Sequence, residues 1–211
     1  MRFKEFSESL ADVEKDPSVR LYRMLTSPFS SSDSASTPDV SDPAASVPAN
    51  TSQVAIKGNE PALREPGFKD ALNRTASNLG VDPNALIQIM KRESSLDPSR
   101  VNPNGGASGL IQFTGDTAGK LGTSLEAIRR MPAVEQLSLV EKYYKRLGVK
   151  PGTSVDDLYM YTFYPAAVGK RDNDVVLRKG QKGYSGNINL DKNRDGYITV
   201  ADVKNFLHNR A

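Results

Sequence analysis

Residues 81–98 read VDPNALIQIMKRESSLDP, and this stretch decides the fold of the chain. Asp82 followed by Pro83 is typical of a helix start, because aspartate caps free N–H groups and proline is tolerated at the first helical position. The apolar residues that follow have the spacing of one helical face, and they are Leu86, Ile87 and Met90. The stretch therefore predicts a helix that buries this face and ends near residue 93 or 95.

Helical patterns also lie on both sides of this stretch. Apolar residues that Gly80 brings to an end predict a preceding helix, and they are Phe68, Leu72 and Leu79. Another helix is expected from about Thr114, and a longer one is marked by Val134, Leu137, Val140, Tyr144 and Leu147. No convincing period-two alternation of strands is present, so we predict a mostly α domain over residues 62–180.

The first 61 residues have a different composition from this domain. Residues 1–26 carry a helical pattern interrupted at Pro17, which predicts a short helical segment too small to be a domain. Residues 27–61 are rich in Ser, Pro and Ala and have few large apolar side chains. Such a segment cannot repay its ordering entropy, so we expect a disordered, flexible linker.

Composition excludes several classes of chemistry. The 211 residues include no cysteine, which rules out disulfides, thiolate metal sites and cysteine nucleophiles. The single histidine, His208, lies three residues before residue 211, a poor place for a catalytic triad. A net charge of +3 suits an anionic polymer such as a cell wall and is too weak to indicate nucleic acid.

The start of the chain bears on where it acts. Residues 1–16 lack the apolar core of a signal peptide, and no stretch is apolar enough to cross a membrane. We therefore expect a protein made in a cytoplasm, with no membrane insertion, that another agent must deliver to its substrate.

Glu93 is the first candidate for a catalytic acid. It lies at the C-terminal end of the expected helix, at the edge of the core. Burial and the negative end of the helix both disfavour ionisation, so the pKa of this carboxyl should be raised, as a general acid requires. The spacing alone favours the alternative, a surface glutamate on an amphipathic helix.

Short motifs in a fixed order resemble the soluble lytic transglycosylase family, which has the lysozyme-like fold. They are Glu93-Ser94, Asp97-Pro98, Gly109-Leu110-Ile111-Gln112 and Thr117-Ala118. The resemblance covers about residues 65–170 and is closer to phage-borne members further along, in RMPAVEQLSLVEKYYKR and FYPAAVGK. In the family's AYNAG element Tyr164 is kept, whereas Pro165 replaces the asparagine and Ala167 the glycine.

The resemblance implies cleavage of the β-1,4 bond between MurNAc and GlcNAc in peptidoglycan by one catalytic glutamate, Glu93. The product is then a 1,6-anhydroMurNAc end, and no cofactor takes part in catalysis. Tyr164 would orient Glu93 or stabilise developing charge, and the glycan-contacting candidates are Ser94, Asn102 and Gln112. Ser94 and Asn102 could instead hold other site residues in place without contacting the glycan. A two-carboxylate hydrolase would need a partner such as Asp97 or Asp116, but we expect Asp97 to bond local backbone and Asp116 to cap a helix.

A second motif lies in residues 181–211, where DKNRDGYITVAD at 191–202 matches a calcium loop. The oxygen ligands it predicts are Asp191, Asn193, Asp195, the carbonyl of Tyr197, Thr199 and Asp202. Gly196 supplies the sharp turn, Ile198 anchors the loop, and the following helix packs through Val203, Phe206 and Leu207. Aspartate at the last position resembles dockerin-type, EF-hand-like loops. The sequence predicts one structural Ca²⁺, and the alternative is an acidic turn without metal.

Three functions remain open at this point. The first is a bacteriophage lytic transglycosylase, either carried in the virion by residues 1–26 and their linker or released to the wall as a free endolysin. The second is a hydrolytic goose-type muramidase. The third is a glycan-binding structural virion protein without catalysis, which the altered FYPAA element would allow.

Overall fold

The computed structural model describes residues 58–103 and 105–208 of the chain. The predicted helical segment 1–26 and the linker up to residue 57 lie outside these described residues. The elements are the helices α3 (Pro61–Arg64), α4 (Phe68–Leu79), α5 (Pro83–Ser94), α6 (Gly115–Lys120), α7 (Leu125–Arg130), α8 (Ala133–Arg146), α9 (Val155–Phe163) and α10 (Val200–His208), the 3₁₀ helices η1 (Pro165–Ala167) and η2 (Ser185–Leu190), and the strands β1 (Val175–Arg178) and β2 (Tyr197–Thr199).

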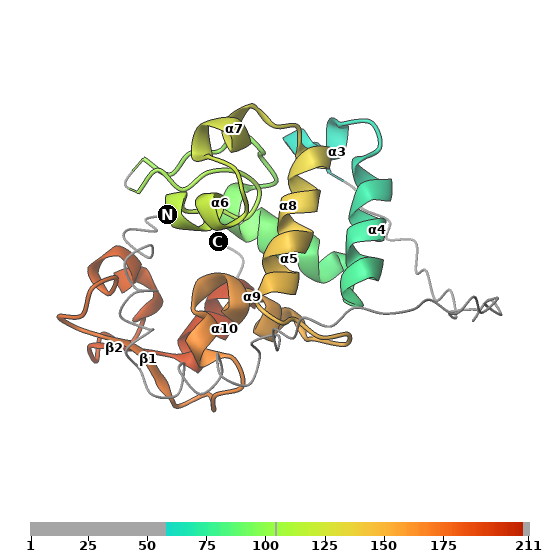
Figure 1. Cartoon of the computed structure of the whole chain (residues 1–211). Helices are drawn as coiled ribbons and strands as arrows, with labels where there is room; N and C mark the ends of the chain where they lie inside the picture. The colour runs from blue at the N-terminus through green and yellow to red at the C-terminus, as the bar shows by residue number, and fades with distance from the viewer. Residues whose placement is uncertain (1–57, 104, 209–211) are drawn as a thin grey trace, which may run out of the picture.

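Three helices form the centre of the molecule. In Figure 1, α4 (cyan-green) and α8 (yellow) run side by side, and α5 (green) packs against α4. Their facing side chains are fully buried, among them Leu72, Ile89, Met90, Leu137 and Val140. The prediction of a mostly α, lysozyme-like domain is confirmed for the described part of the chain.

Local sequence explains where α5 begins and ends. The Asp82 side chain accepts a hydrogen bond from the Asn84 N–H at 2.8 Å, and Pro83 occupies the first turn. At the other end Ser95 adopts a left-handed conformation with φ 59° and closes the helix. The predicted cap, buried face and end of this helix are confirmed.

Gly80 ends α4 as predicted, with φ 67°. A side chain at this position would also collide with Pro151, since an added Cβ would lie 2.6 Å from the Pro151 Cβ. The glycine therefore allows both the turn out of α4 and the close approach of the segment after α8.

One expected cap was wrong. The helix α6 is capped by Thr114, whose hydroxyl accepts the Thr117 N–H at 3.2 Å. Asp116 lies inside the first turn and pairs with Lys120 at 2.9 Å. The threonine precedes the glycine that starts the helix, so it takes the capping position before Asp116 can.

The structure contains a small sheet that the sequence did not predict. Strands β1 and β2 pair antiparallel, with Arg178 opposite Tyr197. At four and three residues, they are too short for alternation to show. The pairing joins the two units predicted to meet at residues 180 and 181, and the adjoining α10 packs on α9 and α5.

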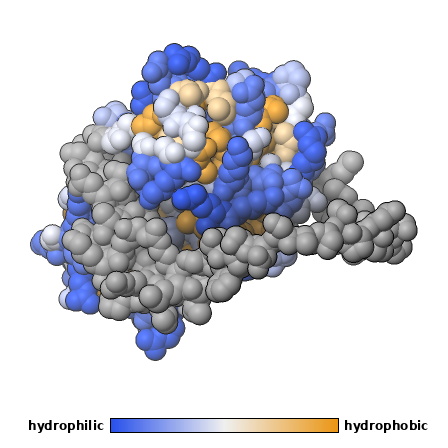
Figure 2. Space-filling model, viewed as in Figure 1, coloured by the Kyte–Doolittle hydropathy of each residue, from blue (hydrophilic) through white to orange (hydrophobic). Residues whose placement is uncertain are grey.

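The face of the molecule drawn in Figure 2 is mainly polar where it is coloured. In Figure 2 hydrophilic residues cover most of the coloured face, and hydrophobic residues show between them in places. No helix among the described residues is long and apolar enough to cross a bilayer.

Candidate active site

Glu93 lies in the last turn of α5 and is only 9% exposed. Its Oε1 is buried and has no hydrogen-bond partner. Burial raises the pKa of Glu93 to about 8, against the smaller lowering effects of the Tyr159 hydroxyl and the Arg92 charge. At neutral pH this carboxyl is therefore protonated and able to donate, as predicted from its position.

The tyrosine beside Glu93 is Tyr159, which the sequence analysis did not identify. It projects from α9, which packs against α5, and its side chain is fully buried. Its hydroxyl interacts with Glu93 but falls short of a well-formed hydrogen bond. Burial, followed by the charge of Glu93, raises the pKa of Tyr159 well above its usual value, so the hydroxyl stays protonated and can donate.

Two tyrosines of α8 lie near the same carboxyl. Tyr143 donates a hydrogen bond to the Tyr161 carbonyl at 2.9 Å, and the Tyr144 hydroxyl pairs with Thr162 at 2.8 Å. Burial is the main cause of the raised pKa of both tyrosines, and the charge of Glu93 adds to it. Glu93 therefore lies among phenols that α8 and α9 hold in place.

Tyr164, the predicted catalytic tyrosine, ends α9. Its N–H donates to the Met160 carbonyl at 2.7 Å, and its side chain is half-buried. Pro165 follows directly and starts η1. The role predicted for Tyr164 stays a prediction.

Ser94 ties the end of α5 to the motif loop that follows. Its hydroxyl lies within hydrogen-bond distance of two carbonyls, that of Met90 at 3.0 Å and that of Leu110 at 2.9 Å, and the residue is 2% exposed. Asn102 is also buried, and its backbone N–H and C=O pair with Ala107 and Gly106. These positions favour the supporting role for both residues over direct contact with glycan.

Gln112 bonds its own loop. Its Nε2 donates to the Gly109 carbonyl at 3.0 Å and to the Arg100 carbonyl at 3.3 Å, and its φ is 54°. The side-chain amide nitrogen is thus committed to holding the loop. The predicted contact of Gln112 with glycan stays a prediction.

Gln136 of α8 is a structural residue that the sequence analysis missed. It is fully buried, and its Oε1 accepts the Leu110 N–H at 2.9 Å. Its Nε2 lies within 3.0 Å of the carbonyls of Pro98, Ile128 and Met131. One amide therefore fixes the loop that begins just after Glu93. The only sequence signal for this role is a glutamine placed among the apolar residues of an amphipathic helix pattern.

The two carboxylates considered as partners of Glu93 have local roles. Asp97 accepts the Ser99 N–H at 2.9 Å and the Ser99 hydroxyl at 2.7 Å, which confirms the expected local turn. Asp116 pairs with Lys120.

The first half of the predicted calcium loop is tightly turned. Asp191 is 5% exposed and accepts the N–H groups of Asp195 and Gly196 at 3.2 and 3.0 Å, as well as the hydroxyl of Tyr184. Asn193 and Asp195 face each other at 2.9 Å. Gly196 has φ 88°, as the sharp turn requires.

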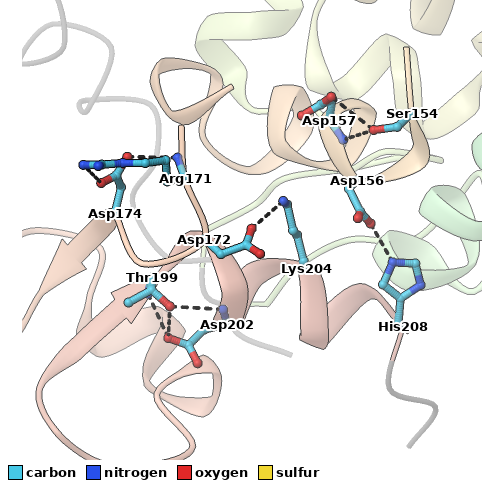
Figure 3. A network of polar contacts seen from close by, with 10 residues as sticks. All are labelled: Ser154, Asp156, Asp157, Arg171, Asp172, Asp174, Thr199, Asp202, Lys204 and His208. Carbon is cyan, nitrogen blue, oxygen red and sulfur yellow. Dashed lines mark hydrogen bonds and ion pairs between the residues drawn. The ribbon is translucent and has the colours of Figure 1, made fainter. Parts of the chain in front are cut away.

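The second half of the loop has local hydrogen bonds of its own. The Asp202 carboxylate accepts the Thr199 N–H at 2.9 Å and its hydroxyl at 2.7 Å, as Figure 3 shows. Across residues 58–103 and 105–208, no three His, Cys, Asp or Glu side chains gather as metal ligands. The oxygen donors of this loop are of the kind that suits a hard cation. Calcium binding stays a prediction.

Comparison with known proteins agrees with this site. Residues 70–140 match the family described as the Transglycosylase SLT domain. The matched segment runs from α4 through half of α8 and contains Glu93, Asn102, Gln112 and Gln136. This match supports a relationship to the lytic transglycosylase family. It also supports an enzyme whose substrate is peptidoglycan. No curated protein matches the chain.

Proposed function

We propose that the chain cleaves the β-1,4 bond between MurNAc and GlcNAc of peptidoglycan, with Glu93 as its single acid and base. One observation carries this proposal. Within the segment that matches the transglycosylase domain, Glu93 is buried with an unpartnered Oε1, and its pKa is raised to about 8.

The proposed reaction takes place in two proton transfers. Protonated Glu93 donates its proton to the glycosidic oxygen while the bond from that oxygen to C1 of MurNAc breaks. The resulting carboxylate then takes the proton of the sugar's own 6-hydroxyl, whose oxygen bonds to C1. Glu93 is protonated again at the end, and the product is a 1,6-anhydroMurNAc terminus.

The surroundings of Glu93 favour this non-hydrolytic route. An intramolecular hydroxyl needs no positioned water, and its effective concentration is very high. A hydrolase would need a second carboxylate about 5–10 Å away. The candidates Asp97 and Asp116 are engaged with Ser99 and Lys120.

Mass spectrometry of fragments released from purified peptidoglycan tests the proposal, with Glu93→Gln as the matched control. We expect anhydro-muropeptides from the wild type and none from the variant. Reducing muramic acid ends would make the enzyme a goose-type muramidase. Binding to the wall without fragments from either protein would make the chain a glycan-binding protein.

We also propose that the chain acts as a component of a phage virion that opens the cell wall from outside the cytoplasm. The similarity of residues 130–146 and 163–170 to phage-borne enzymes supports this setting, and residues 1–26 would attach to tail proteins. A reporter fused to residues 1–61 should co-purify with phage particles. A reporter that stays in the lysate would favour a free endolysin.

A structural Ca²⁺ at residues 191–202 completes the proposal. Its support is the turned first half of the loop, where Asp191, Asn193 and Asp195 supply side-chain oxygens. A calcium-dependent rise in Tm is the expected signature.

A further inference from the structure

The C-terminal helix α10 contacts α5 directly beside Glu93. The guanidinium carbon of Arg92 lies 3.5 Å from the centroid of the Phe206 ring. This is the geometry of a cation–π contact, in which the positive charge sits over the negative face of the ring. Arg92 is the residue that precedes Glu93, so the contact fixes the neighbour of the acid.

Arg92 depends on this ring for its position. Its Nε is buried and has no hydrogen-bond partner, so no polar group holds that part of the guanidinium. The side chain is half-buried and lies in the last turn of α5. A flat ring packed against the guanidinium is the contact that limits where its charge can lie.

Phe206 in turn belongs to a helix that is firmly docked. Val203 and Leu207 of α10 are buried, at 0% and 5% exposed. Figure 3 shows Lys204 paired with Asp172 at 2.6 Å and His208 paired with Asp156 of α9 at 2.5 Å. The helix therefore holds its place against both α5 and α9, which carry Glu93 and Tyr159.

We propose that Phe206 is a positioning residue of the active site, which holds the Arg92 guanidinium at a fixed place beside the Glu93 carboxyl. The C-terminal helix is thereby part of the catalytic unit, although it lies outside the segment that matches the transglycosylase domain. This inference rests on the proposed function of Glu93.

Electrostatics gives the expected direction of the effect. The groups that influence or face Glu93 are Arg92 of α5, Tyr159 of α9, and Tyr143 and Tyr144 of α8. Arg92 is the cation among them and lowers the pKa of Glu93. Without the Phe206 ring the guanidinium can turn toward water, so the pKa of Glu93 should rise.

A titration of the glutamate carboxyl carbons by ¹³C NMR tests this directly, with Glu93→Gln used to assign the Glu93 signal. Phe206→Leu should shift the Glu93 midpoint upward by about 0.5 pH unit or more. Arg92→Gln should give a similar shift, and the double variant should show no further shift, because both changes remove one interaction. The basic limb of cleavage should move in parallel.

His208→Gln is the matched control. It removes the contacts of α10 with Asp156 and Gln88 but leaves the Phe206 ring in place. The Glu93 midpoint should stay where it is in the wild type. If Phe206→Leu does not fold, pentafluorophenylalanine at position 206 keeps the shape of the ring while reversing its electrostatic face.

The outcomes separate this inference from the proposed function. An unchanged midpoint in the Phe206 variants, additive shifts with Arg92→Gln, or an equal shift in His208→Gln would overturn the positioning role. Fragment release by the wild type without these shifts would leave the proposed function standing. Shifts without any fragment release would overturn the proposed function instead.

Discussion

Glu93 is held in surroundings that destabilise the folded chain. Its pKa is 4.5 in an ordinary setting and about 8 in the fold, so the folded protein binds this proton more tightly than the unfolded chain does. Stability is therefore highest below about pH 4.5 with respect to this group, and it falls as pH rises toward 8. Such a cost is typical of a residue retained for chemistry.

Glu93→Gln should therefore stabilise the protein at the pH values where burial of Glu93 costs the wild type stability. The amide has the shape of the neutral acid and does not ionise, so the gain is up to about 3 kcal/mol at pH 7. We expect the variant to melt at higher temperature than the wild type at pH 8 and at a similar one at pH 4.5. Thermal denaturation at both pH values measures this, and equal Tm differences at the two would contradict the burial of Glu93.

Tyr159→Phe tests which tyrosine acts on the acid. Its hydroxyl lowers the pKa of Glu93, so its removal should shift the basic limb of cleavage upward and reduce kcat by about tenfold or more. Tyr164→Phe is the comparison, because it removes the hydroxyl of the tyrosine that caps the same helix. If only Tyr164→Phe shifts the limb, the assignment of Tyr159 is wrong.

Of the residues at the site, Glu93 could be predicted from the sequence and Tyr159 could not. Glu93 could be identified because a motif and a helix end coincide there. Tyr159 could not, because α9 carries tyrosines at 159 and 161 and is followed by Tyr164, and only the packing of α9 against α5 selects one of them. A contact between two helices leaves no trace in the spacing of either helix alone.

At the scale of elements, the loop after α5 is fixed by Gln136 and Gly109 together. Gly109 has φ 83°, and an added Cβ would lie 2.5 Å from the Gln136 Oε1. A methyl group there would push away the amide that accepts the Leu110 N–H. The glycine of the family motif thus has a packing reason in this chain.

Gly109→Ala should destabilise the protein by about 2–4 kcal/mol, from backbone strain and the loss of a buried hydrogen bond. Gly122→Ala is the matched control, because Gly122 has φ 77° but nothing within 4 Å of an added Cβ. Its cost should be about 1 kcal/mol, from the backbone alone. Chemical denaturation compares the two, and equal losses would contradict the role given to Gln136.

Long elements were predictable and short ones were not. The helices over 68–79, 83–94 and 133–146 repeat their apolar spacing over three turns or more, so the pattern is unambiguous. β1 and β2 are too short to show a period, and the strands need each other to form. The cap of α6 was misplaced because Thr114 and Asp116 are both good capping residues two positions apart.

At the scale of the whole molecule, the two units predicted to meet at residues 180 and 181 contact each other. β1 precedes residue 180 and pairs with β2 beyond it, while α10 returns to pack on α5 and α9. Sequence composition gives no information on which segments pair across the boundary predicted at residues 180 and 181. The loop at 191–202 therefore lies between a strand and a helix that both contact the rest of the fold.

Calcium should consequently stabilise the whole described fold and not a separate tail. We expect Ca²⁺ to raise the Tm of a single unfolding transition by a few degrees, since a ligand that binds only the folded state stabilises it. Asn193→Ala removes one ligand at an exposed position and leaves the contact of Asp191 with Tyr184 intact, so it should lose most of the shift. Asn205→Ala, exposed on α10 outside the loop, should keep it. The same Tm with Ca²⁺ and with a chelator would mean that Asp191 and Asp202 serve only their local hydrogen bonds.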